Sequence, residues 1–312
     1  MNDGPLMRAL CICGPSASGK SDAAVAAAID VGGEVVNADS RQIYAGMRIG
    51  TGWPPIDAMT NVPHHLFGIV PPAERYNAVR FVADARAVIA RIVARGHLPI
   101  VVGGTGFYIE ALSGSMPIDR PAGSEELRGR VLREAQSHSH ETLREWLVVL
   151  DPAAASRVPR GDRYRTLRSI EAALAKRDQT EGAASYSSPS QRLHLTTLVL
   201  HVPRHELRAR IARRVNEMFA AGLEEEAIGI RARWPLAPAL TGIGYAEALS
   251  IADGTATRDE AIARCVLRTS QYAARQETWF RRFRTARIIE AGDAAAAASA
   301  VIVAAREITA SK

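Results

Sequence analysis

The pattern of hydrophobic and polar positions along the first hundred residues predicts an α/β protein. Short apolar runs at residues 10–13, 33–37 and 99–102 predict strands. Between them, the alanine-rich residues 21–29 and the residues 78–95, where apolar side chains recur at helical spacing, predict helices. Strand, helix and strand in this order favour parallel pairing. We therefore expect a parallel sheet of about five strands with helices on both faces.

The rest of the chain is mostly helical and more charged. A stretch punctuated by proline and glycine, from Gly46 to Pro72, is expected to be irregular. Residues 124–177 have a charged helical pattern that breaks at Asp151-Pro152, and the polar residues 178–191 predict a mobile loop. Further elements are expected as strands at 195–202 and 286–290, helices at 205–233 and 258–283, and a surface helix near Ala294. The expected domains are a sheet core of residues 1–118, 194–203 and 284–292, and helical insertions of residues 119–193 and 204–283.

The turn after the first predicted strand carries a phosphate-binding loop. Its residues fit the pattern G-x-x-x-x-G-K-[ST] at every fixed position: Gly14, Pro15, Ser16, Ala17, Ser18, Gly19, Lys20 and Ser21. Between a strand and a helix, such a loop holds a di- or triphosphate with backbone N–H groups and the positive end of the helix. Lys20 adds a positive charge, and Ser21 adds a hydroxyl for Mg²⁺. The loop predicts a bound polyphosphate but does not tell which group leaves it.

Composition narrows the class of protein. The 312 residues are 47% hydrophobic, enough for one large domain or two small ones, and no apolar run reaches the ~18 residues of a membrane span. The segment before the first strand is too short for a signal peptide, and the three cysteines support neither a disulfide framework nor a zinc site. We therefore expect a reduced, cytoplasmic protein. The net charge of +6 is compatible with an anionic partner larger than a nucleotide.

Two further turns are expected at the carboxyl edge of the sheet, where ligands bind in open α/β folds. Asp39 ends the second strand, and its carboxylate suits Mg²⁺ ligation, general-base catalysis or a helix N-cap. The turn at residues 103–106 suits either a plain tight turn or a phosphate contact through Thr105 and backbone N–H groups. Several ring-bearing residues are expected to be structural instead: His64, His65, Tyr272, Trp279 and Phe280.

These motifs, with others further along, resemble those of the bacterial tRNA dimethylallyltransferases. The shared blocks follow the family order from about residue 9 to residue 283. They are the phosphate loop and residues 39–44, 44–52, 63–66, 103–108, 151–155, 161–171, 210–215, 241–245 and 275–281. A phosphate loop alone occurs in many enzymes, whereas this ordered series is specific. The resemblance implies a fold like that of the P-loop nucleoside-triphosphate hydrolases, with helical insertions.

The resemblance also implies the reaction. The enzyme would transfer a dimethylallyl group from dimethylallyl diphosphate to N6 of adenosine 37, 3′-adjacent to the anticodon, in tRNAs reading codons that start with U. By similarity, Asp39 is the base that accepts the amine proton. The groups implied to neutralise the leaving diphosphate are Lys20, Thr105, Mg²⁺ on Ser21, and Arg210 or Arg214. Mg²⁺ is the implied cofactor.

The target base must leave its stack to be modified, so a channel lined by tRNA contacts is implied. Three segments of the chain match the family there: Asp39, Ser40, Arg41 and Gln42; Tyr164, Arg165, Thr166, Leu167 and Arg168; and Thr241, Gly242, Ile243, Gly244 and Tyr245. The expected partners are tRNA and dimethylallyl diphosphate, with no membrane, and the expected state is a monomer.

The chain departs from the family pattern at three places. Trp53 stands where a lysine commonly precedes the proline, and Arg48 stands where an acidic residue is common. After Arg177 a polar loop replaces a glycine- and leucine-bearing segment. These departures concern the prenyl pocket and the tRNA clamp.

Three rival functions share some of these features. An adenylate isopentenyltransferase would perform the same chemistry on a free nucleotide, but it would not need the arginine-bearing helices after residue 160. A small-metabolite kinase would leave ~60 helical residues between the third and fourth strands unexplained. A non-catalytic RNA-binding protein would not need Lys20, Ser21 and Asp39 together.

Overall fold

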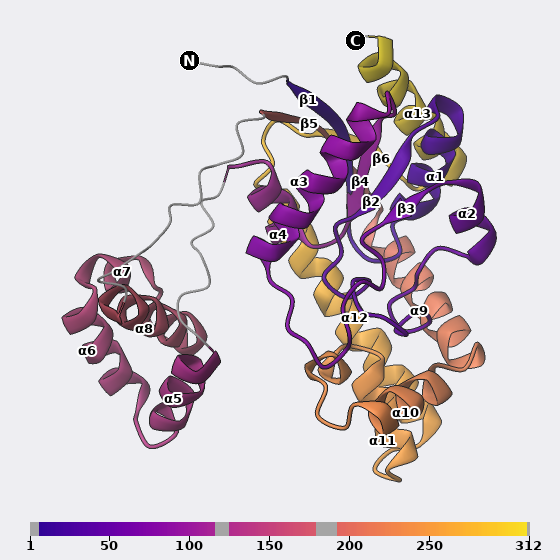
Figure 1. The fold of residues 1–312 in the computed structure, drawn as a ribbon. Helices are drawn as coiled ribbons and strands as arrows, with labels where there is room; N and C mark the ends of the chain where they lie inside the picture. Colours follow the sequence, from indigo (N-terminus) through magenta and orange to yellow (C-terminus); the bar gives the residue numbers. More distant parts are fainter. Residues whose placement is uncertain (1–5, 116–124, 179–191, 311–312) are drawn as a thin grey trace. The chain divides into compact units, whose positions relative to one another are not determined.

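The structure is a computed structural model that describes residues 6–115, 125–178 and 192–310. The chain divides into two compact units. The sheet-bearing unit comprises Met1–Pro117 and Ser190–Lys312, and the helical unit comprises Ile118–Pro189 (Figure 1). The helices between residues 204 and 283 therefore belong to the same unit as the sheet.

In its described residues, the sheet-bearing unit is built on six parallel strands. In chain order they are β1 (Met7–Cys13), β2 (Glu34–Asn37), β3 (His64–His65), β4 (Pro99–Gly103), β5 (Leu193–His201) and β6 (Arg287–Glu290). Their spatial order is β3-β2-β4-β1-β5-β6, with Cys11 of β1 opposite Val101 of β4 and Thr197 of β5. The predicted α/β class is confirmed, but the count of about five strands was too low. β3 was missed because a two-residue strand is too short to show periodicity.

Helices cover both faces of this sheet (Figure 1). The helices described in this unit are α1 (Lys20–Val31), α2 (Ile56–Asn61), α3 (Ala78–Ala94), α4 (Gly106–Leu112), α9 (Arg204–Ala220), α10 (Leu223–Arg233), α11 (Tyr245–Ala252), α12 (Arg258–Phe280) and α13 (Ala294–Ala310), of which α10 and α11 pack beyond the ends of the strands. The long helix α12 starts with a capping box, in which Thr257 and Glu260 satisfy each other's backbone N–H groups. The alanine-rich α13 is more than a surface helix, because Val301, Ala304 and Ala305 are buried where it packs on α1.

Close backbone approach shapes the carboxyl edge of the sheet. A Cβ on Gly14 would lie 2.9 Å from the carbonyl oxygen of Leu200, and one on Gly103 would lie 2.2 Å from that of Ala38. Only glycine therefore fits where β1 and β4 end. This packing brings the phosphate loop, the Asp39 turn and the Gly104 turn to one edge, as the sequence predicted.

The helical unit has its own core. It consists of α5 (Glu125–Ala135), α6 (His140–Leu150), α7 (Pro152–Arg157) and α8 (Arg163–Asp178), packed around buried residues that include Leu143, Leu147 and Ile170. The predicted break lies at Asp151, whose side chain accepts a hydrogen bond from the N–H of Ala154 and so caps α7. The loop predicted at residues 178–191 lies, from residue 179 onward, outside the described residues.

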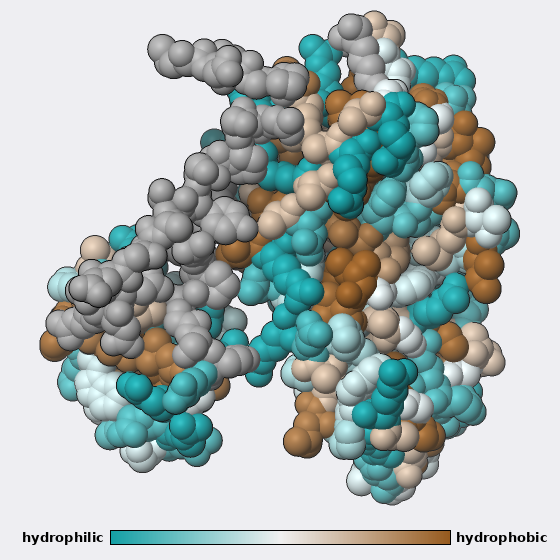
Figure 2. Space-filling model, viewed as in Figure 1, coloured by the Kyte–Doolittle hydropathy of each residue, from teal (hydrophilic) through white to brown (hydrophobic). Residues whose placement is uncertain are grey.

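Among the described residues, no helix combines the length and the hydropathy needed to cross a bilayer. Figure 2 shows hydrophobic residues in several separate patches among hydrophilic ones on the visible face of the sheet-bearing unit.

Candidate functional site

The phosphate loop has the backbone expected of an anion-binding turn. Ala17 and Gly19 have positive φ angles of 64° and 84°, and α1 begins directly after them at Lys20. The Nζ atom of Lys20 donates a hydrogen bond to the carbonyl oxygen of Pro15 at 3.3 Å, so the ammonium folds back over the loop. Successive N–H groups and one positive charge therefore converge on the same small volume.

Arg214 of α9 is the cation whose charge lowers the pKa of Lys20. Burial lowers the pKa of Lys20 to about 8, and the positive charge of Arg214 adds to the shift. Arg214 donates from Nη2 to the carbonyl oxygen of Gly52 at 3.3 Å, and a Cβ at residue 52 would lie 1.8 Å from that nitrogen. Gly52 thus makes room for Arg214. Two positive charges held together in a partly buried place favour a polyanion between them.

The other arginine proposed for this role, Arg210, lies differently. Its Nη2 atom donates to Glu206 at 2.5 Å and to the carbonyl oxygens of Ala291 and Gly292 at 2.9 Å and 2.8 Å. Its charge is therefore already paired, and its donors hold the segment before α13. Between the two alternatives left open by the sequence, the structure places Arg214 beside Lys20.

Asp39 sits in a turn that is braced on both sides. Its N–H donates to Asn37 Oδ1 at 2.9 Å, and its Oδ1 atom accepts from the N–H of Arg41 at 2.8 Å. Thr105 Oγ1 accepts from the N–H of Ser40 at 2.9 Å, which ties the Gly104 turn to this one. Thr105 therefore supports the Asp39 turn, and it lines neither of the two cavities described below.

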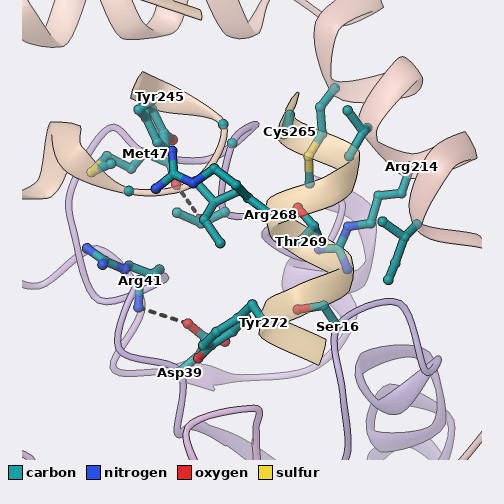
Figure 3. Close-up of a pocket in the computed structure, with 18 of the residues that line it drawn as sticks. Ser16, Asp39, Arg41, Met47, Arg214, Tyr245, Cys265, Arg268, Thr269 and Tyr272 are labelled. Carbon is teal, nitrogen blue, oxygen red and sulfur yellow. Dashed lines mark hydrogen bonds between the residues drawn. The ribbon is translucent and has the colours of Figure 1, made fainter. Parts of the chain in front are cut away.

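A cavity of about 430 Å³ opens over Asp39, and we call it the Asp39 cavity. Its walls come from segments far apart in the sequence: Ser16 and Ala17, residues 39–41, Met47, Gly50 and Thr51, Arg214 and Met218 on α9, residues 239 and 241–245, and residues 265, 268, 269, 271, 272 and 275 on α12. Figure 3 shows Asp39 and Tyr272 at one end, Tyr245 and Met47 at the other, and Arg268 reaching from α12 between them. Asp39 is the one carboxylate among the lining residues, facing several arginines.

A second cavity lies on the other side of Arg214, and we call it the phosphate-loop cavity. Its lining includes Gly19, Lys20, Ser21, Arg48 and Trp53. The two cavities share Ala17, Arg214 and Met218 in their linings. A molecule on the phosphate loop and a molecule beside Asp39 would therefore meet at Arg214.

Gln276 of α12 joins the two turns that frame the Asp39 cavity. Its Oε1 atom accepts from the N–H of Ser16 at 2.9 Å, and its Nε2 atom donates to the carbonyl oxygen of Gly104 at 2.8 Å. The side chain is 5% exposed, and a Cβ on Gly104 would lie 2.3 Å from Nε2. One buried amide therefore fixes α12 against both the phosphate loop and β4.

The lining residues of α12 were not predicted from the sequence. Arg268, Tyr272 and Arg275 follow each other at spacings of four and three, so they share one face of the helix. Tyr272, expected in the core, faces Asp39 instead, and burial together with that carboxylate raises the pKa of Tyr272 to about 12. Phe280 is buried as expected. The signal that was available is the alternation of arginine and aromatic residues at helical spacing.

Residues 241–245 reach the cavity, whereas Gln42 does not. Gln42 is nearly buried, and its amide donates to the carbonyl oxygens of Thr51 and Gly52 at 3.2 Å and 2.9 Å. The Gln42 amide thus holds the loop whose Gly52 carbonyl oxygen also accepts a hydrogen bond from Arg214. The ring of Tyr245 lines the cavity, while its hydroxyl donates to Glu226 at 2.5 Å.

The five residues proposed for tRNA in the helical unit differ in exposure. Tyr164 and Arg165 are exposed, whereas Thr166 is fully buried and its hydroxyl donates to the carbonyl oxygen of Asp162. Leu167 packs against the core of this unit, and Arg168 pairs with the buried Glu171. Tyr164 and Arg165 can therefore meet a ligand as they stand.

A divalent cation fits this site only together with a phosphate ligand. Among the described residues, no group of three His, Cys, Asp or Glu side chains could hold a metal ion. Ser21 lies beside Lys20 in the phosphate-loop cavity, and in the described part of the chain its hydroxyl has no hydrogen bond. Mg²⁺ accepts one or two protein oxygens when phosphate oxygens and water complete its octahedron. Ser21 and a bound diphosphate would form such a set.

The histidine pair lies away from both cavities. His65 and His97 hydrogen-bond to the buried carboxylate of Glu34 at 2.6 Å and 2.7 Å, and Arg95 pairs with it at 2.7 Å. Burial alone would raise the pKa of Glu34, but these three partners lower it to about 2. His64 hydrogen-bonds to the carbonyl oxygen of Val62. The pair anchors β3, a structural role as expected.

Known proteins match this chain over most of its length. A family model described as IPP transferase matches residues 42–283. A tRNA dimethylallyltransferase of Anaeromyxobacter dehalogenans is 43% identical over 279 residues, 89% of this chain and 93% of that protein. One of Geobacter sulfurreducens is 39% identical over 274 residues, 87% of this chain and 88% of that protein.

Solved structures agree with the sequence relatives. The full-length tRNA isopentenylpyrophosphate transferase of Bacillus halodurans has a TM-score of 0.69 at 30% identity, covering 98% of both chains. A eukaryotic dimethylallyltransferase acting on tRNA shares the fold, with a TM-score of 0.78 at 23% identity over 98% of this chain and 80% of that one. The family expected from the motifs is thus confirmed, and the chain belongs to the IPP transferase family.

Proposed function

We propose that this chain is a tRNA dimethylallyltransferase. It transfers the dimethylallyl group of dimethylallyl diphosphate to N6 of adenosine 37, next to the anticodon, in tRNAs that read codons starting with U. The observation that carries the proposal is the junction at Arg214, where the phosphate-loop cavity meets the Asp39 cavity. The names of its relatives support the same activity.

On the donor side, the phosphate loop acts on a leaving group. When the bond between C1 of the prenyl group and oxygen breaks, its electron pair stays on the diphosphate, where negative charge grows. Lys20, Arg214 and the N–H groups at the start of α1 surround this volume and stabilise that charge. Ser21 would hold Mg²⁺ together with the bound diphosphate, and the ion would supply further neutralisation of the leaving group.

On the acceptor side, Asp39 takes a proton. N6 of adenine is a weak nucleophile because its lone pair is delocalised into the ring. As the N6–C1 bond forms, one N6 proton must leave so that the product amine is neutral. Asp39 Oδ1 is held by the N–H of Arg41, while Oδ2 has no hydrogen-bond partner among the described residues. Oδ2 is therefore the atom that accepts the proton.

The shape and charge of the Asp39 cavity suit a base that has left its stack. Tyr272 presents a ring beside Asp39, and residues 241–245 form the opposite wall. Arg41 and Arg275 are exposed at the cavity and carry the positive charge that neighbouring phosphates require. A base flipped out of the anticodon loop can stack and bond there.

Label transfer tests this function. The protein is incubated with Mg²⁺ and labelled dimethylallyl diphosphate, with tRNA, with AMP or without an acceptor. We expect label in tRNA only, and a matched tRNA carrying guanosine at position 37 should stay unlabelled. Transfer to AMP at a rate comparable with tRNA would instead identify an adenylate isopentenyltransferase. In a parallel sample with added ATP, turnover of ATP without label transfer would identify a kinase.

We further propose that the enzyme works as a monomer in the cytoplasm, where its tRNA substrate resides. The residues that line both cavities all belong to the sheet-bearing unit of a single copy, as a monomeric enzyme requires. Light scattering at assay concentrations should give one chain of 33.6 kDa.

A further inference from the structure

One wall of the phosphate-loop cavity carries a cation that the mechanism above does not use. The guanidinium of Arg48 lies over the ring of Trp53, with Cζ 5.4 Å from the ring centre, and both residues line this cavity. Arginine over an indole face is held by attraction to the ring's negative quadrupole. The side chain is nevertheless exposed, so its N–H groups remain free for a ligand.

Trp53 is fixed in place and can serve as a platform. Its ring packs edge-on against Phe67, with centroids 5.7 Å apart. On another side it lies against Gly68, where a Cβ would be 2.4 Å from the ring. Gly68 also has a φ of 60°, so both the close indole ring and the backbone angle favour glycine at this position. The indole is therefore positioned by its neighbours and not by Arg48.

The backbone beneath Arg48 is equally well held. The N–H groups of Arg48, Ile49 and Gly50 all donate to the carboxylate of Glu226, at distances from 2.9 Å to 3.1 Å. Three successive donors on one carboxylate fix where the Arg48 side chain starts. Its far end rests on Trp53, so both ends of this long side chain are restrained, and little rotamer entropy remains to be lost on binding.

The charges around the cavity leave Arg48 without a carboxylate partner. Arg210 pairs with Glu206 and Arg213 with Glu217. In contrast, Lys20, Arg214 and Arg48 form no ion pair within the described part of the chain. Arg214 stands at the junction of the two cavities, whereas Lys20 and Arg48 line only the phosphate-loop cavity, Lys20 on the loop itself and Arg48 on the wall with Trp53. A ligand with two linked phosphates would place the second phosphate toward that wall.

We propose that Arg48, held on Trp53, binds the distal phosphate of the prenyl diphosphate, while the loop and Lys20 bind the proximal one. The proposal rests on the proposed function for the identity of the donor. Trp53 acts through Arg48 and is a positioning residue. Where the family commonly has a lysine before the proline, this chain has Trp53 before Pro54. Arg48, earlier in the same loop, supplies the positive charge instead.

Binding of two inorganic anions, without tRNA, tests the proposal. Arg48→Met should raise the Kd of inorganic pyrophosphate about tenfold, as expected for one charge-assisted contact at a partly exposed place. It should leave the Kd of orthophosphate, which needs only the loop, within about twofold of the parent. Arg208→Met is the matched control, because Arg208 is an exposed arginine on α9 that lines neither cavity, and it should change neither Kd.

Trp53 variants separate positioning from structure. Trp53→Leu should weaken pyrophosphate binding about threefold, and Trp53→Phe, which keeps a ring, should restore most of it. In the double variant with Arg48→Met, Trp53→Leu should cause no further loss, because its effect passes through Arg48. Turnover with tRNA should show a raised KM for the prenyl donor and an unchanged KM for tRNA.

Several results would overturn the proposal. In Arg48→Met, an unchanged Kd for pyrophosphate, or an equal loss of affinity for orthophosphate and pyrophosphate, would contradict it. Additive losses of affinity in the double variant would show that Trp53 does not act through Arg48. A raised KM for tRNA would assign Arg48 to RNA binding. The proposed function fails separately, if the parent enzyme transfers no prenyl group to tRNA. The anion measurements do not depend on that outcome.

Discussion

The two cavities that meet at Arg214 are built in opposite ways. The phosphate-loop cavity takes Lys20, Ser21 and its backbone N–H donors from one continuous segment at the start of α1, and it adds Arg48 and Arg214 from other parts of the chain. The Asp39 cavity collects its lining from separate stretches of chain between residues 16 and 275. Local backbone geometry suffices for the phosphate loop itself, whereas the Asp39 cavity exists only after α9, α11 and α12 have packed. A change in packing should therefore harm the Asp39 cavity first.

The strongest test of the Asp39 side is Asp39→Asn. The amide has nearly the same size but cannot accept the N6 proton, so the single-turnover rate should fall about 10²–10⁴-fold. Binding of tRNA should persist, which filter binding can measure. A rate near that of the parent would show that the carboxylate only shapes its turn.

On the phosphate-loop side, Lys20→Met should lower the single-turnover rate by about 10²–10³-fold, because one group that stabilises the leaving group is lost. The same variant should unfold at a higher temperature. Burial lowers the pKa of Lys20 to about 8, so at neutral pH the folded state holds an unfavourably placed charge. This destabilisation of the folded state is fully present below pH 8. It decreases as the pH rises toward the pKa of lysine in the unfolded chain, 10.5. A stable but inactive variant would separate the two properties, whereas a lowered melting temperature would contradict this view of the charge.

Gln276→Leu tests whether packing of α12 links the two sides. It leaves the N–H of Ser16 and the carbonyl oxygen of Gly104 without their partner, so stability should fall by about 1–3 kcal/mol. We expect kcat to fall about tenfold, because α12 carries Tyr272 and Arg275. Thr278→Val, at an exposed position of the same helix that lines neither cavity, is the control for stability. If kcat stays constant while stability falls, the link is structural only.

The pH dependence of anion binding sharpens the same comparison. Lys20 loses its proton as pH rises through about 8, so pyrophosphate should bind up to about tenfold more weakly per pH unit above that value. Lys20→Arg should remove this dependence, because arginine stays charged. Titration calorimetry from pH 7 to 9.5 would measure it. A parent profile that matches the arginine variant would place the titrating group elsewhere.

The smallest effect is expected in the helical unit. Arg165→Ala should weaken tRNA binding a few-fold and reduce the slope of log K against log salt by about one. Arg165 is 59% exposed in its side chain, so the variant should not affect folding. Arg168→Ala is the contrast, because it removes one of the two arginines that pair with the buried Glu171, leaving Arg128 at 4.0 Å, and it should destabilise the unit. Equal salt slopes for parent and Arg165→Ala would remove this residue from the tRNA surface.

Much of the fold followed from periodicity. The strands β1, β2, β4, β5 and β6 and the helices α1, α3 and α12 lie where apolar runs and helical spacing predicted them. The short elements α2 and β3 were missed in a stretch expected to be irregular. Their two to six residues carry too few positions for a pattern, and tertiary pairing such as Val35 with His64 decides their conformation.

The sequence by itself determined the phosphate loop, the turn at Asp39 and the family, because each depends on residues that are neighbours in the chain. Only the tertiary structure decided which arginine stands beside Lys20, that Tyr272 faces Asp39 rather than the core, and that Gln276 joins α12 to the loop. Helical spacing tells which side chains share a face but not what that face meets. That choice belongs to packing, where residues more than two hundred positions apart come within hydrogen-bonding distance.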